Sequence, residues 1–242
     1  MSVLATTGLT KRYGGLMAND GVAVALTQGE IRGLIGPNGA GKTTFVNLVT
    51  GIERPDAGEV MLNGSAITGF GPHRVAKNGL VRSFQVARVF GNLTVRENLL
   101  VPYFASERTS GRASALARIT ELLRLSTLEP LADHLAKSLS GGQRMLLQAC
   151  AGFMIPGVKV HVLDEPFAGI NPVVKDTLIE LILNENQAGA TFLIVSHEME
   201  IIRRICPRVT VMIAGKVAAE GPLEEIARRD DVVTAYLGRS LQ

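Results

Sequence analysis

The segment Gly36-Pro-Asn-Gly-Ala-Gly41-Lys42-Thr43-Thr44 decides the fold of this chain. It fits the pattern G-x-x-x-x-G-K-[ST] without a mismatch, between an apolar run at Ile31–Ile35 and helical spacing at Thr43–Thr50. Glycines allow positive φ angles, so backbone N–H groups can wrap a phosphate at the positive end of the helix dipole. Lys42 would reach the β- and γ-phosphates of a nucleotide, and the Thr43 hydroxyl would bind Mg²⁺. The alternative, a glycine-rich turn with a surface lysine, does not require this strand–loop–helix context.

A second signal is an acidic pair, Asp164 and Glu165, after the apolar run Val160-His-Val-Leu163. Open α/β sheets bind ligands at the carboxyl ends of their strands, where such a pair would emerge. Asp164 would hold Mg²⁺, directly or through water, and Glu165 would polarise an attacking water as general base. The plain alternative is a solvated Asp-Glu at a strand end. The phosphate loop favours the functional interpretation.

The rest of the chain alternates between apolar strand-like runs and helical spacing, which predicts a parallel sheet covered on both faces. A capping box at Thr94-Val-Arg-Glu97 and the spacing of Arg112–Leu125 predict helices in the middle of the chain. Ser196 is expected to cap a later helix. Other expected elements are strands at Val22–Leu26, Glu59–Leu62, Val158–Leu163 and Ala190–Val195, a turn at Asn63-Gly64, and a helix beginning at Asn171-Pro172. Leu116, Ile119, Leu122 and Leu123 are expected on one helix face, and Val174, Leu178, Leu181 and Ile182 on another.

Composition narrows the class of protein. The 242 residues are 46% hydrophobic and 19% charged, with a formal net charge of +3. No run of like charges forms a basic stripe, so we expect no nucleic-acid partner. The two cysteines, Cys150 and Cys206, form no C-x-x-C pair, which indicates a reducing compartment. No stretch approaches the ~18 apolar residues of a membrane span, so any membrane role would need partner chains.

The pentapeptide Leu139-Ser140-Gly141-Gly142-Gln143 is the third signal. By itself it reads as a helix start, with Ser140 as N-cap and Gln143 completing a capping box. Two glycines in a first turn cost about 1 kcal/mol each relative to alanine, and a purely structural cap does not need them. They are explained if a phosphate approaches this helix N-terminus closely.

In this order, the three motifs closely resemble the ATPases of ABC transporters, and the resemblance covers nearly the whole chain. It implies a single α/β domain over residues 1–242. A P-loop NTPase (RecA-like) core with a parallel sheet and an N-terminal antiparallel β subdomain would occupy residues 1–85 and 155–242. An inserted α-helical subdomain would occupy residues 86–154. It implies ATP and Mg²⁺ as ligands. The implied ATP-binding residues are Tyr13, which would stack on adenine, Gly36, Pro37, Asn38, Gly39, Ala40, Gly41, Lys42, Thr43, Thr44, Ser140, Gly141, Gly142 and Gln143.

The same resemblance assigns the remaining site residues. Glu165, His197 and Gln85 would be catalytic, and Thr43, Gln85 and Asp164 would bind Mg²⁺. Each assignment by resemblance has an ordinary alternative. Tyr13 could be a loop aromatic, Gln85 could cap a turn, and His197 could lie in a first helical turn behind Ser196. A zinc protease motif H-E-x-x-H is excluded, because Ile201 stands where the second histidine would be.

The resemblance also implies partners. In this family the signature of one domain completes the nucleotide site of another, so this chain would form a homodimer, or a heterodimer with a sister ATPase. Transmembrane permease subunits would dock near Gln85 and residues 86–100, and a periplasmic solute-binding protein would act indirectly. The chain would be cytoplasmic and peripheral on the inner face of the cell membrane.

A finer likeness is to the ATPase subunits of branched-chain amino acid importers. It rests on three stretches, Leu9–Gly15, Asp164–Pro172 and Val232–Gly238. Urea and amide importers and the lipopolysaccharide-export ATPase share these features and stay open, and a soluble ABC ATPase is a further alternative. The chain departs from the family at Met145, Leu146 and Ala151, where arginines are common.

Overall fold

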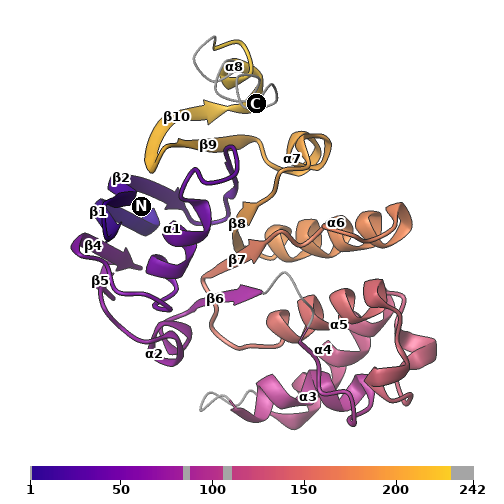
Figure 1. Cartoon of the computed structure of the whole chain (residues 1–242). Helices are drawn as coiled ribbons and strands as arrows, with labels where there is room; N and C mark the ends of the chain where they lie inside the picture. Colours follow the sequence, from indigo (N-terminus) through magenta and orange to yellow (C-terminus); the bar gives the residue numbers. More distant parts are fainter. Residues whose placement is uncertain (1, 84–87, 106–110, 230–242) are drawn as a thin grey trace.

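A computed structural model of the chain describes residues 2–83, 88–105 and 111–229, and it contains two β-sheets and a group of helices (Figure 1). The larger sheet has the strand order β10-β9-β3-β8-β7-β6, and the smaller has the order β2-β1-β4-β5. The larger sheet comprises β3 (Ile31–Ile35), β6 (Leu80–Ser83), β7 (Val160–Asp164), β8 (Thr191–Val195), β9 (Arg208–Ile213) and β10 (Lys216–Pro222). The smaller sheet comprises β1 (Ser2–Tyr13), β2 (Leu16–Thr27), β4 (Ala57–Leu62) and β5 (Ser65–Ala66).

The larger sheet is parallel except for β10, which pairs antiparallel with β9. Every residue of β3, β7 and β8 is buried, which explains why these strands read as continuous apolar runs. The expected strands Val158–Leu163 and Ala190–Val195 correspond to β7 and β8 with small shifts of their ends. Because β7 and β8 are neighbours and β8 also pairs with β3, the carboxyl ends of these strands meet at one edge.

The smaller sheet is antiparallel and forms the N-terminal subdomain. The expected strands Val22–Leu26 and Glu59–Leu62 lie within β2 and β4. The expected turn is confirmed, because Asn63 and Gly64 have positive φ angles of 48° and 76° and join β4 to β5.

Helices fill the interval between β6 and β7, at the lower right of Figure 1. The capping box of α3 is confirmed, because the Thr94 N–H donates to Glu97 Oε2 at 2.7 Å and the Glu97 N–H donates to Thr94 Oγ1 at 3.1 Å. The expected apolar face of α4 is wrong at Leu116, whose side chain is exposed, whereas Ala115 takes the buried place one residue earlier. This interval contains α3 (Val95–Ala105), α4 (Arg112–Leu125), two short 3₁₀ turns (Glu129–Leu131 and Ala136–Ser138) and α5 (Gly141–Phe153).

The remaining helices cover or flank the larger sheet. They are α1 (Lys42–Val49), α2 (Pro72–Lys77), α6 (Pro172–Gln187), α7 (Met199–Ile205) and α8 (Leu223–Ile226). The expected start of α6 is confirmed, because Asn171 Oδ1 accepts the Val174 N–H at 3.0 Å and Pro172 opens the helix. Among the described residues, no helix has the length and apolar character needed to cross a membrane.

The expected cap of α7 is wrong, because this helix begins at Met199 with Glu198 at the N-cap position. The Ser196 hydroxyl instead accepts the Glu198 N–H at 3.1 Å. Residues 196–198 therefore form a turn after β8, since the side chain satisfies a backbone donor before the helix starts. His197 accordingly lies in this turn and outside the helix.

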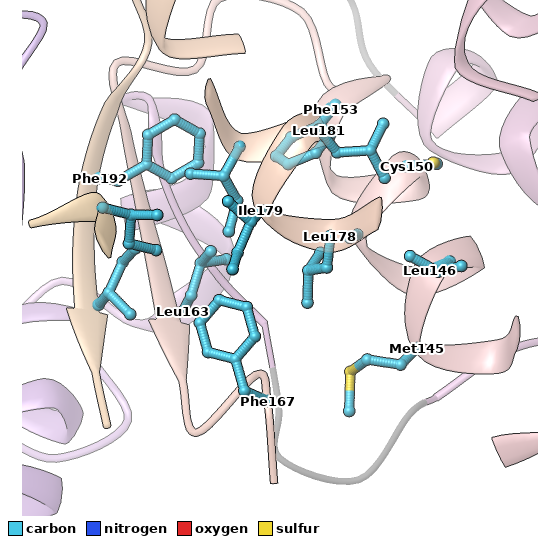
Figure 2. Packing of buried hydrophobic residues seen from close by; sticks show 14 of the residues in the cluster. Met145, Leu146, Cys150, Phe153, Leu163, Phe167, Leu178, Ile179, Leu181 and Phe192 are labelled. Atoms are coloured by element: carbon cyan, nitrogen blue, oxygen red, sulfur yellow. The ribbon is translucent and has the colours of Figure 1, made fainter. Parts of the chain in front are cut away.

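Helix α6 joins the sheet to the helical subdomain through one apolar core (Figure 2). Its residues Leu178, Ile179 and Leu181 lie between Leu163 and Phe192 of the sheet and the side chains of α5. Met145 and Leu146 of α5 are buried in this core, with exposed fractions of 6% and 2%. At these two places, where the resemblance implied arginines, this chain packs apolar side chains inward and stabilises the contact between the subdomains.

Candidate functional site

The phosphate loop lies where the sequence predicted it, between the end of β3 and the start of α1. Gly41 is the N-cap residue of α1, with a left-handed φ of 95°, and no side chain caps the helix by a hydrogen bond. A Cβ atom at Gly41 would lie 2.3 Å from the Ala18 carbonyl oxygen, so only glycine fits. Asn19 of β2 donates to the Gly41 carbonyl at 3.2 Å and anchors the loop to the N-terminal sheet. The first turn of α1 is thereby presented with its positive dipole end uncovered by any cap.

Lys42 lies over its own loop. Its Nζ donates to the carbonyl oxygens of Gly36 and Pro37 at 2.6 and 3.1 Å. Burial lowers the pKa of Lys42, and the negative charges of Glu165 and Asp164 act in the opposite direction. The ammonium group is therefore held close to two carboxylates in a partly desolvated place, where attraction to an added phosphate is strong.

The acidic pair lies at the end of β7, as predicted. Glu165 has a left-handed φ of 49°, which is unusual for this residue type and costs about 1–3 kcal/mol. Its N–H donates to the Val195 carbonyl at 2.9 Å, so the end of β8 holds this conformation. Glu165 Oε2 lies 2.9 Å from His197 Nδ1. Two catalytic residues expected from different parts of the chain are therefore in direct contact.

Asp164 is paired with an arginine that the sequence interpretation did not assign to the site. Arg82 Nη2 donates to Asp164 Oδ2 at 2.5 Å, and Arg82 Nη1 donates to Asn47 Oδ1 at 2.6 Å. Arg82 lies directly before the expected catalytic segment, and Asn47 stands four residues after Thr43 on α1, so it faces the same side of the helix. These two spacings are the only hints in the sequence that Arg82 and Asn47 lie near the site. Neither spacing shows that Arg82 pairs with Asp164.

A cavity of about 710 Å³ lies between the phosphate loop and the acidic pair, and neither His197 nor Asn47 is among its described lining residues. This volume lies within the 300–1,000 Å³ typical of small-molecule sites. The expected ligands that line it are Tyr13, Asn38, Gly39, Ala40, Gly41, Lys42, Thr43, Thr44, Asp164 and Glu165. Arg82, Arg88, the start of β2, Val195 and Ala214 complete the lining.

Tyr13 lines the cavity from the end of β1, next to the turn that leads into β2. Its side chain is 43% exposed, so part of the ring remains open to a flat ligand. The Tyr13 hydroxyl donates to Glu53 Oε2, and burial together with this carboxylate raises the pKa of Tyr13. The ring is thus held by its hydroxyl end, as an aromatic platform would require.

The signature residues lie elsewhere, at the N-terminus of α5 in the helical subdomain. Ser140 Oγ accepts the Gln143 N–H at 3.2 Å, and Gln143 Oε1 accepts the Ser140 N–H at 2.9 Å, so the predicted capping box is confirmed. Among the described residues, those lining the cavity do not include Ser140, Gly141, Gly142 or Gln143.

The two signature glycines have different surroundings. A Cβ atom at Gly142 would lie 3.0 Å from Val174 Cγ2, so this glycine allows α5 to approach the start of α6. A Cβ atom at Gly141 would have nothing within 4 Å. Only Gly141 is left without an explanation in the packing of the chain itself.

Some expectations lie outside the described residues. Gln85 does so, as do Phe84 to Ala87 around it, and so does the C-terminal stretch Val232–Gly238.

Comparison with known proteins agrees with this geometry. The family model described as "ABC transporter" matches residues 19–168. A probable branched-chain amino acid transport ATP-binding protein, LivG of Archaeoglobus fulgidus, is 38% identical over 98% of this chain and 96% of its own length. The high-affinity branched-chain amino acid transport ATP-binding proteins BraF of Pseudomonas aeruginosa and LivG of Escherichia coli are 34% and 36% identical, over 98% of each chain.

Solved structures give the same result. The ADP conformation of MJ1267, an ATP-binding cassette of an ABC transporter, has a TM-score of 0.85 and 31% identity, over 98% of this chain and 99% of its own. A nucleotide-free ATP-binding cassette from an ABC transporter has a TM-score of 0.84 and 30% identity, over the same shares. With the phosphate loop, the acidic pair and the capped signature helix in place, the chain belongs to the ABC transporter family and is one of its ATPase cassettes.

Proposed function

We propose that this chain binds MgATP in the cavity at the edge of the larger sheet and uses its hydrolysis to energise uptake of branched-chain amino acids. The observation that carries the proposal is that Lys42, Asp164 and Glu165 line one cavity, while His197 contacts Glu165 at 2.9 Å. The first part concerns the chemistry of the site, and the second concerns the transported solute.

The residues present fit a magnesium nucleotide. The hydroxyl of Thr43 and the carboxylate of Asp164 line the same cavity and are hard oxygen ligands. Mg²⁺ in nucleotide sites is usually held by one or two protein ligands together with phosphate oxygens, so these two groups suffice. When bound, the ion would neutralise charge on the phosphates. We propose that Gln85 contributes a further ligand.

The chain's own groups supply the remaining chemistry. The loop N–H groups and Lys42 would hold the β- and γ-phosphates, and Tyr13 would stack on the adenine. Glu165 would accept a proton from water as the water oxygen bonds to the γ-phosphorus and the bond to ADP breaks. His197, which touches Glu165 through Nδ1, would orient that carboxylate and contact the γ-phosphate.

The position of the signature supports a site that two chains share. Ser140 to Gln143 lie on α5, and Gly141 has open space where a phosphate of another chain could approach. We propose that two cassettes, identical or sister subunits, face each other so that the signature of each closes the cavity of the other.

The relatives guide the proposal for solute and location, because three of them at 34–38% identity are named for branched-chain amino acid transport. We propose that the dimer lies on the inner face of the cell membrane and docks on permease subunits through residues 86–100. A periplasmic binding protein would deliver the solute. The proposed division is a core at residues 1–85 and 155–242 with a helical subdomain at residues 86–154.

The test is reconstitution of the chain with the membrane subunits that co-purify with it, in vesicles that enclose MgATP. Accumulation of labelled leucine that requires both ATP and the periplasmic binding protein would support the proposal. ATP hydrolysis coupled to uptake of urea, or to extraction of lipopolysaccharide, would refute the proposed solute while leaving the ATPase chemistry intact.

A further inference from the structure

The ion pair between Arg82 and Asp164 joins two neighbouring strands of the larger sheet. Arg82 on β6 is opposite Val162 in the parallel register, so Asp164, two residues further on β7, faces the same side. The side chains are 10% and 12% exposed, so the pair is largely shielded from water. Losing one member would leave an uncompensated charge in a poorly hydrated place.

The guanidinium group of Arg82 has a second partner. While Nη2 holds Asp164, Nη1 holds Asn47 Oδ1 on α1, directly behind the phosphate loop. A planar guanidinium carries several donors in a rigid fork, and it keeps its charge at any ordinary pH. The two contacts together tie one oxygen of the Asp164 carboxylate to α1 through a single rigid group.

The network continues beyond Asn47. Asn47 Nδ2 donates to Glu53 Oε1 at 2.7 Å, and Glu53 Oε2 accepts the Tyr13 hydroxyl. A continuous set of hydrogen bonds therefore runs from Asp164 through Arg82, Asn47 and Glu53 to Tyr13, and both of its end residues line the cavity. The partners fix the orientation of the Asn47 amide, because its oxygen faces a pure donor and its nitrogen faces a carboxylate.

We propose that Arg82 is a positioning residue for Asp164 and holds this carboxylate in the orientation needed to bind Mg²⁺. Through Asn47 and Glu53, Arg82 also links Asp164 to Tyr13. This inference rests on the proposed role of Asp164 as a magnesium ligand. Ligating carboxylates are commonly held by outer hydrogen bonds, and loss of such a bond typically weakens metal affinity about 10- to 100-fold. One oxygen, Oδ2, takes the arginine, and the other carboxylate oxygen would serve the metal.

A double-mutant cycle on the full-length chain tests the inference. The variants are Arg82→Met, Asp164→Asn and the double variant, and the probe is a fluorescent trinitrophenyl-ATP. Its dissociation constant is measured with Mg²⁺ and with EDTA, and the ratio of the two values gives the gain from magnesium. Arg96→Met is the matched control, because Arg96 is paired with Asp133 in the helical subdomain, at 3.2 Å.

We expect Arg82→Met to reduce the magnesium gain about 10-fold or more, with little change in EDTA. In the Asp164→Asn background the same substitution should cause no further loss, because the carboxylate it positions is gone. Arg96→Met should leave the gain unchanged. An equal loss from Arg82→Met in both backgrounds, or an equal loss in EDTA, would overturn the inference.

Two further variants separate charge from geometry and guard against misfolding. Arg82→Lys keeps the charge but cannot hold Asp164 and Asn47 as a rigid fork, so we expect a smaller loss of the magnesium gain than with methionine. Asn47→Ala keeps the ion pair and removes the second contact, and it should also reduce the gain. A full magnesium gain in both variants would overturn the positioning role. A full gain in Asp164→Asn would instead refute the proposed function of Asp164.

Discussion

Helices α1 and α5 both begin in glycine-rich stretches, but their first turns are built differently. Helix α1 starts behind Gly41 without a capping side chain and carries Lys42 in its first turn. Helix α5 starts behind Ser140, which forms a reciprocal capping box with Gln143. The first helix leaves its positive end to a ligand and supplies its own cation. In α5 the capping box satisfies N–H groups of the helix's own first turn, which suits the proposed role of this helix end as a surface for a second chain.

The phosphate loop before α1 can be interpreted within one chain, whereas the signature at the start of α5 cannot. Residues 38–44 of the phosphate loop, Asp164 and Glu165 line one cavity, so their proposed functions can be argued from a single chain. The signature glycine Gly141 has open space around it, so its role concerns a surface.

The largest expected effect is at the acidic pair in the cavity next to α1. Glu165→Gln should lower the rate of phosphate release about 10²- to 10⁴-fold, because general-base catalysis contributes that much. ATP affinity should stay within about twofold of wild type, since the amide keeps the shape of the side chain. Glu180→Gln, at an exposed position on α6, is the control. A rate near that of the wild type would show that Glu165 is not the base.

Next in size is loss of the cation that α1 supplies. Lys42→Ala should weaken ATP binding about 10- to 100-fold, because a charged hydrogen bond to phosphate contributes about 1.5–3 kcal/mol. Equilibrium binding of a fluorescent nucleotide measures this, with the exposed Lys137→Ala as control. Unchanged affinity in Lys42→Ala would remove the distinction between the two helices.

A smaller effect is expected from the cap of α5. Ser140→Ala should lower the free energy of unfolding by about 1 kcal/mol, the usual worth of an N-cap side chain. Thr94→Ala, which removes the equivalent contact on α3, should cost a similar amount in urea unfolding. Only Ser140→Ala should also weaken ATP-dependent dimerisation. If both variants dimerise like wild type, Ser140 is a structural cap alone.

The smallest effect separates the two signature glycines. Gly142→Ala should be less stable than Gly141→Ala by up to about 1 kcal/mol, because its Cβ atom would press on Val174 while both gain helix propensity. Urea unfolding of the pair measures the difference. Adding Val174→Ala to Gly142→Ala should restore part of the loss. Equal stabilities would show that Gly142 is not needed for the approach of α5 to α6.

Much of the fold followed from local patterns in the sequence. The buried strands β3, β7 and β8, the turn at Asn63 and the caps at Thr94, Ser140 and Asn171 depend on neighbouring residues, so periodicity and cap chemistry found them. Strand β1 was not predicted as an element, because positive φ at Gly8 and shifts in its pairing with β2 break the alternation that marks a strand.

The parts of the site that are contiguous in the sequence could be predicted. The contacts between residues far apart in the sequence could not. Gly36 to Thr44 and the acidic pair are contiguous motifs. Arg82 joins Asn47 and Asp164, which lie 35 and 82 residues away along the chain. The pairing of β6 with β7 brings Arg82 to Asp164, and the packing of α1 brings Asn47 to Arg82, so no local pattern could show these contacts. The error at Ser196 has a local origin, since a serine before a helix can accept an N–H of the turn before the helix as well as one of the helix itself.

We propose above all that the cavity lined by the phosphate loop and the acidic pair is half of a site that a second chain completes. Analytical ultracentrifugation of Glu165→Gln, with and without Gly141→Asp, tests it most directly at saturating MgATP. We expect the single variant to sediment as a dimer. The double variant should sediment as a monomer that still binds one ATP per chain. The added carboxylate would repel the phosphates of the ATP bound to the opposing chain. Dimerisation of both variants, or a monomeric Glu165→Gln with ATP bound, would contradict the account.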